Sequence, residues 1–161
     1  MAHLVDLRLC HTAEDFAAAH GLFLEYAREL DMDLCFQGFE KELKELHVQY
    51  NHPGGALFLL TINNELAGCA GIRRISDQYC ELKRMYIRAF GRGKGYGGWM
   101  LQQAVKKAAL MGYRMMRLDT LPSMQQAIAL YRSRHFVEIP AYRENPVQGA
   151  IYFERELSDQ L

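Results

Sequence analysis

The sequence predicts a single α/β domain that spans residues 1–161. Segments with the two-residue alternation of strands occur between segments with the three- and four-residue spacing of amphipathic helices. A run of glycines between residues 91 and 98 opens a long amphipathic helical segment. No repeat, linker or low-complexity segment divides the chain, and 161 residues are enough to bury a good core.

The first third of the chain predicts a strand and two helices. Residues 4–9 alternate apolar and polar side chains, which is typical of a strand. Thr12 is the predicted N-cap of a first helix, because acidic residues follow it in the first turn. The apolar stripe of this helix consists of Phe16, Ala19, Phe23, Tyr26 and Leu30. After a loop over residues 31–38, a second, shorter helix is expected among residues 36–46.

A meander of three strands is predicted next. The sequence His-Pro-Gly-Gly at residues 52–55 breaks the chain before a strand over Ala56–Ile62. Asn63 and Asn64 occupy a two-residue hairpin turn, and residues 66–75 form the partner strand. A third strand over residues 80–88 leads into the glycine run.

The last part of the chain predicts two helices and three strands. Residues 94–111 form an amphipathic helix that ends before Gly112. A strand over residues 114–120 precedes a short helix over residues 124–134, in which Ala127, Leu130 and Tyr131 face inward. Residues 136–139 and 150–156 are two closing strands, separated by a polar loop at residues 142–146.

Composition excludes several classes of protein. Half of the residues are apolar and 24% are charged, which is ordinary for a soluble globular protein. The first residues lack the features of a signal peptide, and the longest apolar run is far too short to cross a bilayer. We therefore expect a cytoplasmic protein with no membrane partner. The cysteines and histidines lack metal-ligand spacing, so we expect no metal and read the thiols as core residues.

Charge is distributed unevenly, although the net charge is zero. Residues 1–80 carry 12 acidic and 6 basic side chains, whereas residues 82–134 carry 11 Lys and Arg and one acid, Asp119. This local excess around the glycine run favours a polyanionic ligand, and a solvated basic face is the alternative. A nucleic acid is not the expected partner, because no recognition helix is evident and the whole chain is neutral.

The glycine run predicts a seat for phosphate. Residues 91–98 read Gly-Arg-Gly-Lys-Gly-Tyr-Gly-Gly, and the start of a helix presents free N–H groups with a partial positive charge. A P-loop is excluded because Lys94 is followed by Gly95 in place of Ser or Thr. A dinucleotide fingerprint matches as a pattern, but the strand before it is charged and belongs to a meander, which disfavours this interpretation.

The third interpretation is an acyl-CoA seat, Arg92-x-x-Gly95-x-Gly97. Here the chain resembles the GNAT superfamily of acyl-CoA-dependent N-acetyltransferases. The resemblance covers most of the chain and is most specific between residues 81 and 136. It includes Ala127-Ile128-Ala129-Leu130-Tyr131 followed by His135-Phe136, which is similar to the family pattern A-x-x-L-Y-x-x-x-G-F. The chain departs from the family at Met124, where Asn is frequent, and at His135, where Gly is usual.

The resemblance implies a mixed, mostly antiparallel central sheet of about six to seven strands with helices on both faces. It implies a splay between the strand before the glycine run and the strand after the long helix. It also implies acetyl-CoA as the acyl donor and no metal. The residues implied for donor binding are Met85, Tyr86 and Ile87 at the pantetheine, Arg92, Gly93, Lys94, Gly95, Tyr96, Gly97 and Gly98 at the pyrophosphate, and Ala127.

The resemblance further implies direct acetyl transfer, in a ternary complex, to a primary amine. Tyr131 stands at the position of the family's general acid, and a core aromatic residue is the alternative. Glu81 stands where some members carry a base that acts through water, and an ion pair with Lys83 or Arg143 is the alternative. Backbone N–H groups of Tyr86 or Ile87 would polarise the thioester carbonyl.

The acceptor is implied to be a small molecule, with an amino-acid-like compound as one option, or a peptide. Its candidate residues are Asp31, Asp33, Phe36 and Gln37 on one side, and Tyr142, Arg143, Glu144 and Asn145 on the other. The acidic first half suits a cationic amine, and Arg143 would suit a carboxylate. A simple structured turn at residues 142–146 is the alternative. A non-catalytic acyl-CoA sensor remains a second function, and a homodimer is one assembly that the sequence allows.

Overall fold

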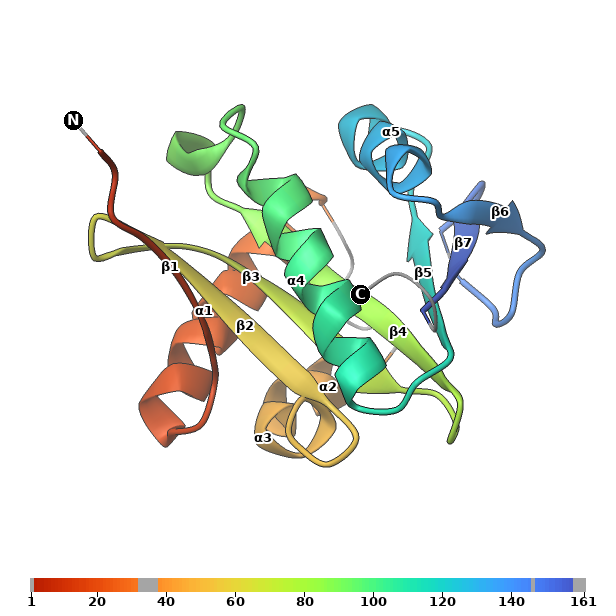
Figure 1. The fold of residues 1–161 in the computed structure, drawn as a ribbon, viewed down its shortest axis with the longest axis horizontal. Helices are drawn as coiled ribbons and strands as arrows, with labels where there is room; N and C mark the ends of the chain where they lie inside the picture. Colours follow the sequence, from red (N-terminus) through yellow and green to blue (C-terminus); the bar gives the residue numbers. More distant parts are fainter. Residues whose placement is uncertain (1, 32–37, 146, 158–161) are drawn as a thin grey trace.

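The computed structural model describes residues 2–31, 38–145 and 147–157. Its elements, in chain order, are β1 (Val5–Leu9), α1 (Ala13–Glu29), α2 (Phe39–Lys44), α3 (Leu46–Gln49), β2 (Ala56–Ile62), β3 (Glu65–Arg74), β4 (Tyr79–Ile87), η2 (Ala89–Gly91), α4 (Tyr96–Leu110), β5 (Met115–Thr120), α5 (Gln125–Ser133), β6 (Val137–Ile139) and β7 (Ile151–Glu156). Figure 1 shows their arrangement in space.

The strands form one seven-stranded sheet with the order β1-β2-β3-β4-β5-β7-β6. Neighbouring strands are antiparallel except β4 and β5, which run parallel because α4 connects them as a crossover helix. The mixed, mostly antiparallel sheet expected from the sequence is therefore confirmed. The β2–β3 hairpin turns at Asn63 and Asn64, which both have positive φ, as the predicted two-residue turn requires.

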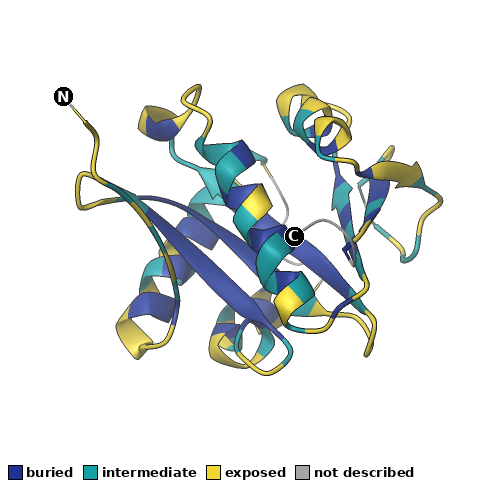
Figure 2. Ribbon diagram, in the orientation of Figure 1, coloured by how far each residue is buried: buried dark blue, intermediate teal, exposed yellow. Residues whose placement is uncertain are grey.

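Helices cover both faces of the sheet. On one face α4 and α5 bury side chains such as Met100, Leu101 and Ile128 in a cluster with apolar residues of the strands. On the other face α1, α2 and α3 bury Phe23, Phe39 and other apolar side chains in a second cluster. The central strands between these two layers are buried along most of their length (Figure 2).

The boundaries of most elements agree with the prediction to within a few residues. The structure differs from the prediction in three other respects. The helix expected among residues 36–46 is two short helices, because Glu45 has non-helical backbone angles between them. The short helix η2 precedes the glycine run and was not predicted. In α5 the buried residues are Ile128 and Tyr131, whereas Ala127 and Leu130 are only partly buried.

Two local predictions are resolved by backbone geometry. Thr12 caps α1 in a capping box with Asp15, as the acidic first turn indicated. His135, which replaces the usual Gly, adopts a φ of 68°. The turn after α5 therefore keeps the left-handed conformation for which glycine is preferred, and a non-glycine side chain is strained in it.

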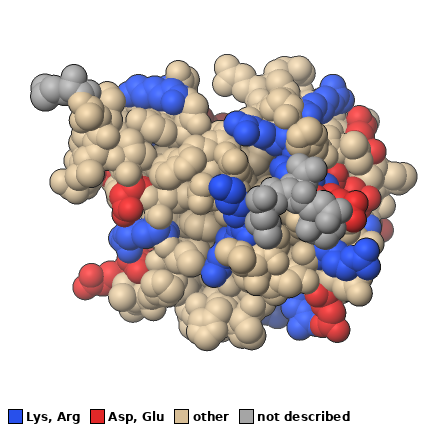
Figure 3. All heavy atoms as spheres, viewed as in Figure 1, with Lys and Arg blue, Asp and Glu red and all other residues tan. Residues whose placement is uncertain are grey.

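The excess of basic residues between positions 82 and 134 is partly neutralised inside the fold. Acids from the first half of the chain pair with these basic residues in three contacts: Arg84 with Glu42, Arg88 with Glu25, and Arg92 with Glu29. On the face that α4 covers, other Lys and Arg side chains remain at the surface (Figure 3). None of the helices in the described part of the chain combines the length and apolar character needed to cross a membrane.

Candidate functional site

The parallel pairing of β4 with β5 stops partway along both strands. It joins Tyr79 to Met115 and extends to Glu81 opposite Arg117, whereas β4 continues to Ile87 and β5 to Thr120. The two strands diverge beyond this point (Figure 1), and we call the opening the fork. On the side of the fork, the backbone groups of β4 from Leu82 onward have no strand partner in the described sheet. This is the splay that the resemblance to the GNAT superfamily implied.

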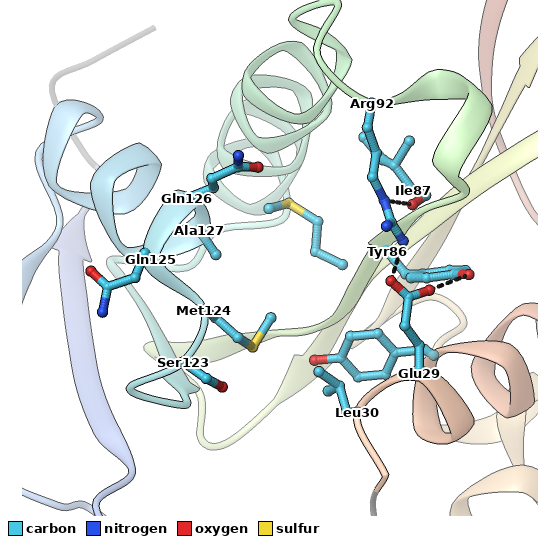
Figure 4. A pocket seen from close by; sticks show the side chains of 12 residues that line it. Glu29, Leu30, Tyr86, Ile87, Arg92, Ser123, Met124, Gln125, Gln126 and Ala127 are labelled. Atoms are coloured by element: carbon cyan, nitrogen blue, oxygen red, sulfur yellow. Dashed lines mark hydrogen bonds and ion pairs between the residues drawn. The ribbon is translucent and has the colours of Figure 1, made fainter.

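A cleft of about 520 Å³ opens at the fork. Figure 4 shows that the end of α1 and β4 form one wall and that the start of α5 forms the other. Of the residues predicted to bind the donor, Met85, Tyr86, Ile87, Arg92 and Ala127 line this cleft. The structure therefore brings the strand before the glycine run next to the helix that carries Tyr131.

Residues 93–98 lie at the start of α4. Gly93 and Gly95 have φ values of 74° and 84°, and a Cβ atom at either position would meet no heavy atom within 4 Å. Gly95 is the N-cap of α4, and no side chain caps the helix. The first N–H groups of α4, including those of Tyr96, Gly97 and Gly98, have no partner within the helix. This geometry leaves an open seat of N–H donors, which suits an anion.

The two basic side chains of the glycine run are engaged within the protein. Arg92 donates hydrogen bonds to the Ile87 carbonyl at 2.7 Å and to Glu29 at 2.5 Å. Glu29 also accepts a hydrogen bond from the Tyr86 hydroxyl at 3.0 Å. Lys94 donates to the Phe90 carbonyl at 3.0 Å. Arg92 thus crosses the free edge of β4 and joins it to α1 (Figure 4).

A β-bulge in β4 determines which side chains face the fork. Arg84 and Met85 together lie opposite the single residue Ala70 of β3, and Arg84 has a φ of 56°. As a result, the successive residues Lys83 and Arg84 both pair with carboxylates on the α1–α2 face of the sheet. Met85 and Ile87, after the bulge, pack against the opposite core.

Seven charged side chains on the α1–α2 face form one connected set of ion pairs, which we call the fork cluster. Its members are the carboxylates of Glu42, Glu81 and Asp119 and the cations of Arg73, Lys83, Arg84 and Arg143. Four of the seven residues, the three on β4 among them, are buried. Such a concentration of buried charge is unusual in a protein core and is typical of functional sites.

Glu42 from α2 is the deepest carboxylate of the fork cluster. Its two oxygens accept hydrogen bonds from Arg84 at 2.9 and 3.0 Å, and it also pairs with Arg73 at 3.2 Å. Burial alone would raise the pKa of Glu42, but the hydrogen bonds and charge of Arg84, together with the charge of Arg73, outweigh it and lower the pKa. Glu42 is therefore ionised at neutral pH and holds Arg84 in its strained backbone position.

Glu81 lies inside the fork cluster, and its side chain is only 4% exposed. Both of its carboxylate oxygens are occupied. Arg73 lies at 2.6 Å and Arg143 at 3.0 Å, and the Tyr142 hydroxyl donates a hydrogen bond at 3.1 Å. Glu81 does not line the cleft. Of the two roles considered from the sequence, these contacts favour the ion pair with Arg143.

Asp119, near the end of β5, connects the fork cluster to the loop before β7. It accepts hydrogen bonds from Arg143 at 3.2 Å and from Asn145 at 2.9 Å, and Lys83 lies at 3.6 Å. Burial would raise the pKa of Asp119, but the charges of Lys83 and Arg143 outweigh it and lower the pKa. The predicted acceptor residues Tyr142, Arg143 and Asn145 are thereby brought to the fork.

A second, smaller cavity of about 40 Å³ adjoins the cleft at the fork. The two share Tyr26, Leu30 and Met124 as lining residues. The smaller cavity is further lined by two members of the fork cluster, Arg84 and Asp119, and by Asn145 and Thr120 among others. A molecule in the cleft therefore has charged and polar groups immediately beside it.

Tyr131 lies in the core behind the cleft. Its ring centroid is 5.8 Å from that of Phe136 and 6.1 Å from that of Phe153. The hydroxyl makes no hydrogen bond with the described residues, and Tyr131 does not line the cleft. Burial raises the pKa of Tyr131, and the neighbouring Tyr26 and Asp119 raise it further. The phenol therefore keeps its proton at neutral pH.

Sequence reasoning missed part of the site. Tyr26, Glu29 and Leu30, at the end of α1, line the cleft, although the apolar stripe of α1 had assigned Tyr26 and Leu30 to the core. Burial raises the pKa of Tyr26 to about 12. The charged residues within predicted strands, such as Lys83 and Arg84, were the available signal for the fork cluster. The acceptor candidates Asp33, Phe36 and Gln37 lie outside the described residues.

No group of three or more His, Cys, Asp or Glu side chains in residues 2–31, 38–145 and 147–157 is arranged to hold a metal ion. Of the cysteines, Cys10, Cys69 and Cys80 are free and buried, as core thiols are expected to be.

Sequence comparison identifies related proteins. Residues 24–136 match the profile of the Acetyltransferase (GNAT) family. An uncharacterized N-acetyltransferase of Schizosaccharomyces pombe is 32% identical over 139 residues, which is 85% of this chain and 85% of the relative. An uncharacterized N-acetyltransferase of Escherichia coli is 32% identical over 113 residues, which is 68% of each chain.

Solved structures share the fold. A GNAT family acetyltransferase from Staphylococcus aureus superposes with a TM-score of 0.81 at 16% identity, covering 96% of this chain and all of the other. A GNAT family acetyltransferase from Elizabethkingia anophelis, solved with acetyl-CoA bound, superposes with a TM-score of 0.65 at 21% identity, covering 95% and 98%.

Proposed function

Because this chain belongs to the acetyltransferase (GNAT) family, we propose that it transfers the acetyl group of acetyl-CoA to a primary amine of a small molecule. In direct transfer, the amine nitrogen attacks the thioester carbonyl carbon, a C–N bond forms and the C–S bond breaks. The amine gives up its extra proton, and CoA leaves as a thiolate that takes up a proton. The protein must therefore bind both substrates, polarise the carbonyl and supply a proton to sulfur.

The observation that carries this proposal is the free edge of β4 leading into the uncapped start of α4. Beyond Glu81 the fork side of β4 has no strand partner, so the backbone over Met85, Tyr86 and Ile87 can pair with the amide groups of pantetheine as an added strand would, with the Ile87 carbonyl exchanging its hydrogen bond from Arg92. The N–H groups over residues 93–98 then receive the pyrophosphate. Open space at Gly93 and Gly95 allows a ligand to approach the backbone there. In the structure from Elizabethkingia anophelis this fold binds acetyl-CoA.

The side chains of the glycine run have a secondary role in this proposal. Arg92 and Lys94 are bonded within the protein, so they add positive charge near the pyrophosphate without being its main ligands. Ala127 and Met124 contribute apolar contacts at the wall of the cleft. Met124 replaces the family's frequent Asn, so the backbone of β4 and α4 carries more of the donor recognition.

We assign Tyr131 as the general acid that protonates the leaving thiolate. Its raised pKa keeps the hydroxyl protonated until transfer, so the phenol can donate a hydrogen bond and then its proton to the sulfur as the C–S bond breaks and negative charge develops there. The hydroxyl has no other hydrogen-bond partner among the described residues that would compete for its proton. Glu81 is assigned to the positioning of Tyr142 and Arg143, since its two oxygens are already occupied.

An acetyl-CoA consumption assay over a panel of primary amines tests the function. We expect turnover with at least one amine and transfer of the acetyl group to nitrogen, identified by mass spectrometry of the product. Acetyl-CoA binding measured by calorimetry provides the second readout. Binding without transfer over the whole panel would instead identify a sensor of acyl-CoA, and absence of binding would refute the donor site.

A further inference from the structure

The fork cluster holds more positive than negative charge. Four cations face three carboxylates in one set of contacts, so one positive charge remains uncompensated among the described residues. Isolated charges are costly to bury, and buried cations are therefore normally matched by anions. Within the part of the chain that the structure describes, the fork cluster is thus one anion short.

The described side chains around the fork cluster do not supply this anion. Tyr50 and Tyr142 contact it, but burial raises the pKa of both phenols, so they remain neutral. Arg117 and Glu154 lie beside it and neutralise each other at 3.1 Å. Glu45 reaches it only through a hydrogen bond from Gln49, and Glu144 and Asp31 are exposed.

Lys83 is the cation with the weakest compensation. Its side chain is 4% exposed, and among residues 2–31, 38–145 and 147–157 its ammonium has Asp119 as its one ion-pair partner, at 3.6 Å. The ammonium donates no hydrogen bond within 3.5 Å to any residue in the described part of the chain. Arg73 and Arg84, by contrast, each donate a charged hydrogen bond of 3.0 Å or less to a carboxylate. The missing negative charge is therefore localised at Lys83.

Two members of the fork cluster face the small cavity beside the cleft, and Lys83 and Arg143 reach this cavity through their contacts with Asp119. Arg84 and Asp119 line the small cavity, and this cavity shares Tyr26 and Met124 with the cleft. A group in the small cavity lies beside the cleft in which the donor's reactive end is expected. Hydrogen-bonding groups of Tyr26 and Thr120 line the same cavity.

We propose that the acceptor carries a carboxylate as well as its amine, and that this carboxylate enters the small cavity beside Arg84 and supplies the negative charge that the fork cluster lacks. The acceptor class is thus amino acids and compounds with the same pair of groups. This inference rests on the proposed acetyl transfer. A polyamine is disfavoured as an acceptor because it would add further positive charge to the fork cluster.

Matched acceptors test the proposal. Each of the twenty amino acids is compared with its amide, which keeps the amine and the side chain but lacks the carboxylate. We expect the best amino acid to exceed its amide in kcat/KM by about 10- to 100-fold, the effect of a hydrogen bond to a charged group. Lys83→Met and Arg143→Gln should each reduce this preference. Arg88→Met is the control, because Arg88 directly follows β4 and is ion-paired with Glu25, but is not a member of the fork cluster.

A binding measurement separates this inference from the proposed function. N-acetyl amino acids and their amides are titrated against the wild-type protein in the presence of CoA, and chemical-shift changes are followed by NMR. Binding of the carboxylates in preference to the amides supports the inference even without turnover. Equal acetylation of acids and amides would overturn the inference and leave acetyl transfer intact, and equal binding of the two product series would overturn it as well. If Lys83→Met does not fold, Arg143→Gln provides the same comparison. The side chain of Arg143 is 29% exposed, so its replacement disturbs the core less.

Discussion

Replacing Lys83 with Met should make the protein more stable and less able to use its acceptor. The substitution removes a buried charge and keeps most of the side-chain volume. Burial, and after it the charge of Arg84, lower the pKa of Lys83 from 10.5 to about 8. One pKa unit corresponds to about 1.4 kcal/mol, so the unfavourable environment of the ammonium costs the folded state about 3 kcal/mol below pH 8.

The carboxylate of Asp119, which pairs with Lys83 in the wild type, keeps other partners in this variant. Asp119 keeps the hydrogen bonds from Arg143 and Asn145, so no unpaired buried carboxylate is created. Buried ions exchanged for apolar groups of similar volume often leave stability unchanged or raise it by about 1–4 kcal/mol. We therefore expect Lys83→Met to gain about 1–3 kcal/mol in the free energy of unfolding at pH 7.

The stability difference between Lys83→Met and the wild type should depend on pH. The folded protein releases the Lys83 proton near pH 8, whereas the unfolded chain keeps it up to about pH 10.5. Between these values the unfolded state binds more protons, so wild-type stability gains from rising pH. The advantage of Lys83→Met should accordingly be largest below pH 8 and shrink towards pH 10.5.

Urea unfolding of both proteins at pH 7 and pH 10, followed by circular dichroism, measures this difference. Arg88→Met serves again as the control for removal of an ion-paired side chain, and it should lose stability at both pH values. A Lys83→Met protein that is less stable than wild type at pH 7, or whose advantage does not change with pH, would refute the argument that Lys83 is an uncompensated buried cation.

Three further predictions concern the donor site and the turn after α5. Tyr131→Phe should lower kcat by about 10- to 100-fold with unchanged acetyl-CoA affinity, because only the proton donor is removed, and wild-type turnover would contradict this role. Gly95→Asp should abolish acetyl-CoA binding in calorimetry, since it adds strain and negative charge at the N-cap of α4. Gly112→Asp, at a φ of 95° beyond the other end of α4, is its strain control and should bind normally. His135→Gly should raise the free energy of unfolding by about 1 kcal/mol in urea titration by relieving its positive φ, and no change would show that the turn is unstrained.

The donor half of the site was predictable because its signals are local in the sequence. The glycine run, the strand before it and the start of α5 each have a short-range pattern, and the parallel crossover connection brings them to one end of the sheet. Met85, Tyr86, Ile87, Arg92 and Ala127 accordingly line the cleft. Tyr131 lies on the expected helix, although it packs behind the cleft and its catalytic role remains a prediction.

The acceptor half was less predictable because its contacts join distant segments. Arg84 pairs with Glu42, which is 42 residues away, and no periodicity connects the two. The β-bulge that turns Arg84 to the same face as Lys83 depends on the pairing of β4 with β3. Tyr26 has the same three- and four-residue spacing as the core residues of α1. Its position in the wall of the cleft follows from the opening of the fork, which the spacing does not reveal.

The sequence by itself determined the order and approximate limits of the strands and helices, the glycine-rich start of the long helix and the resemblance to a family, because side-chain periodicity and glycine geometry act over a few residues. The tertiary structure decided where charge is compensated. It paired the basic residues of the middle of the chain with acids from the first half, enclosed Glu81, and left Lys83 at 3.6 Å from one carboxylate. Charge compensation depends on distances in space, and these exist only once the sheet has formed.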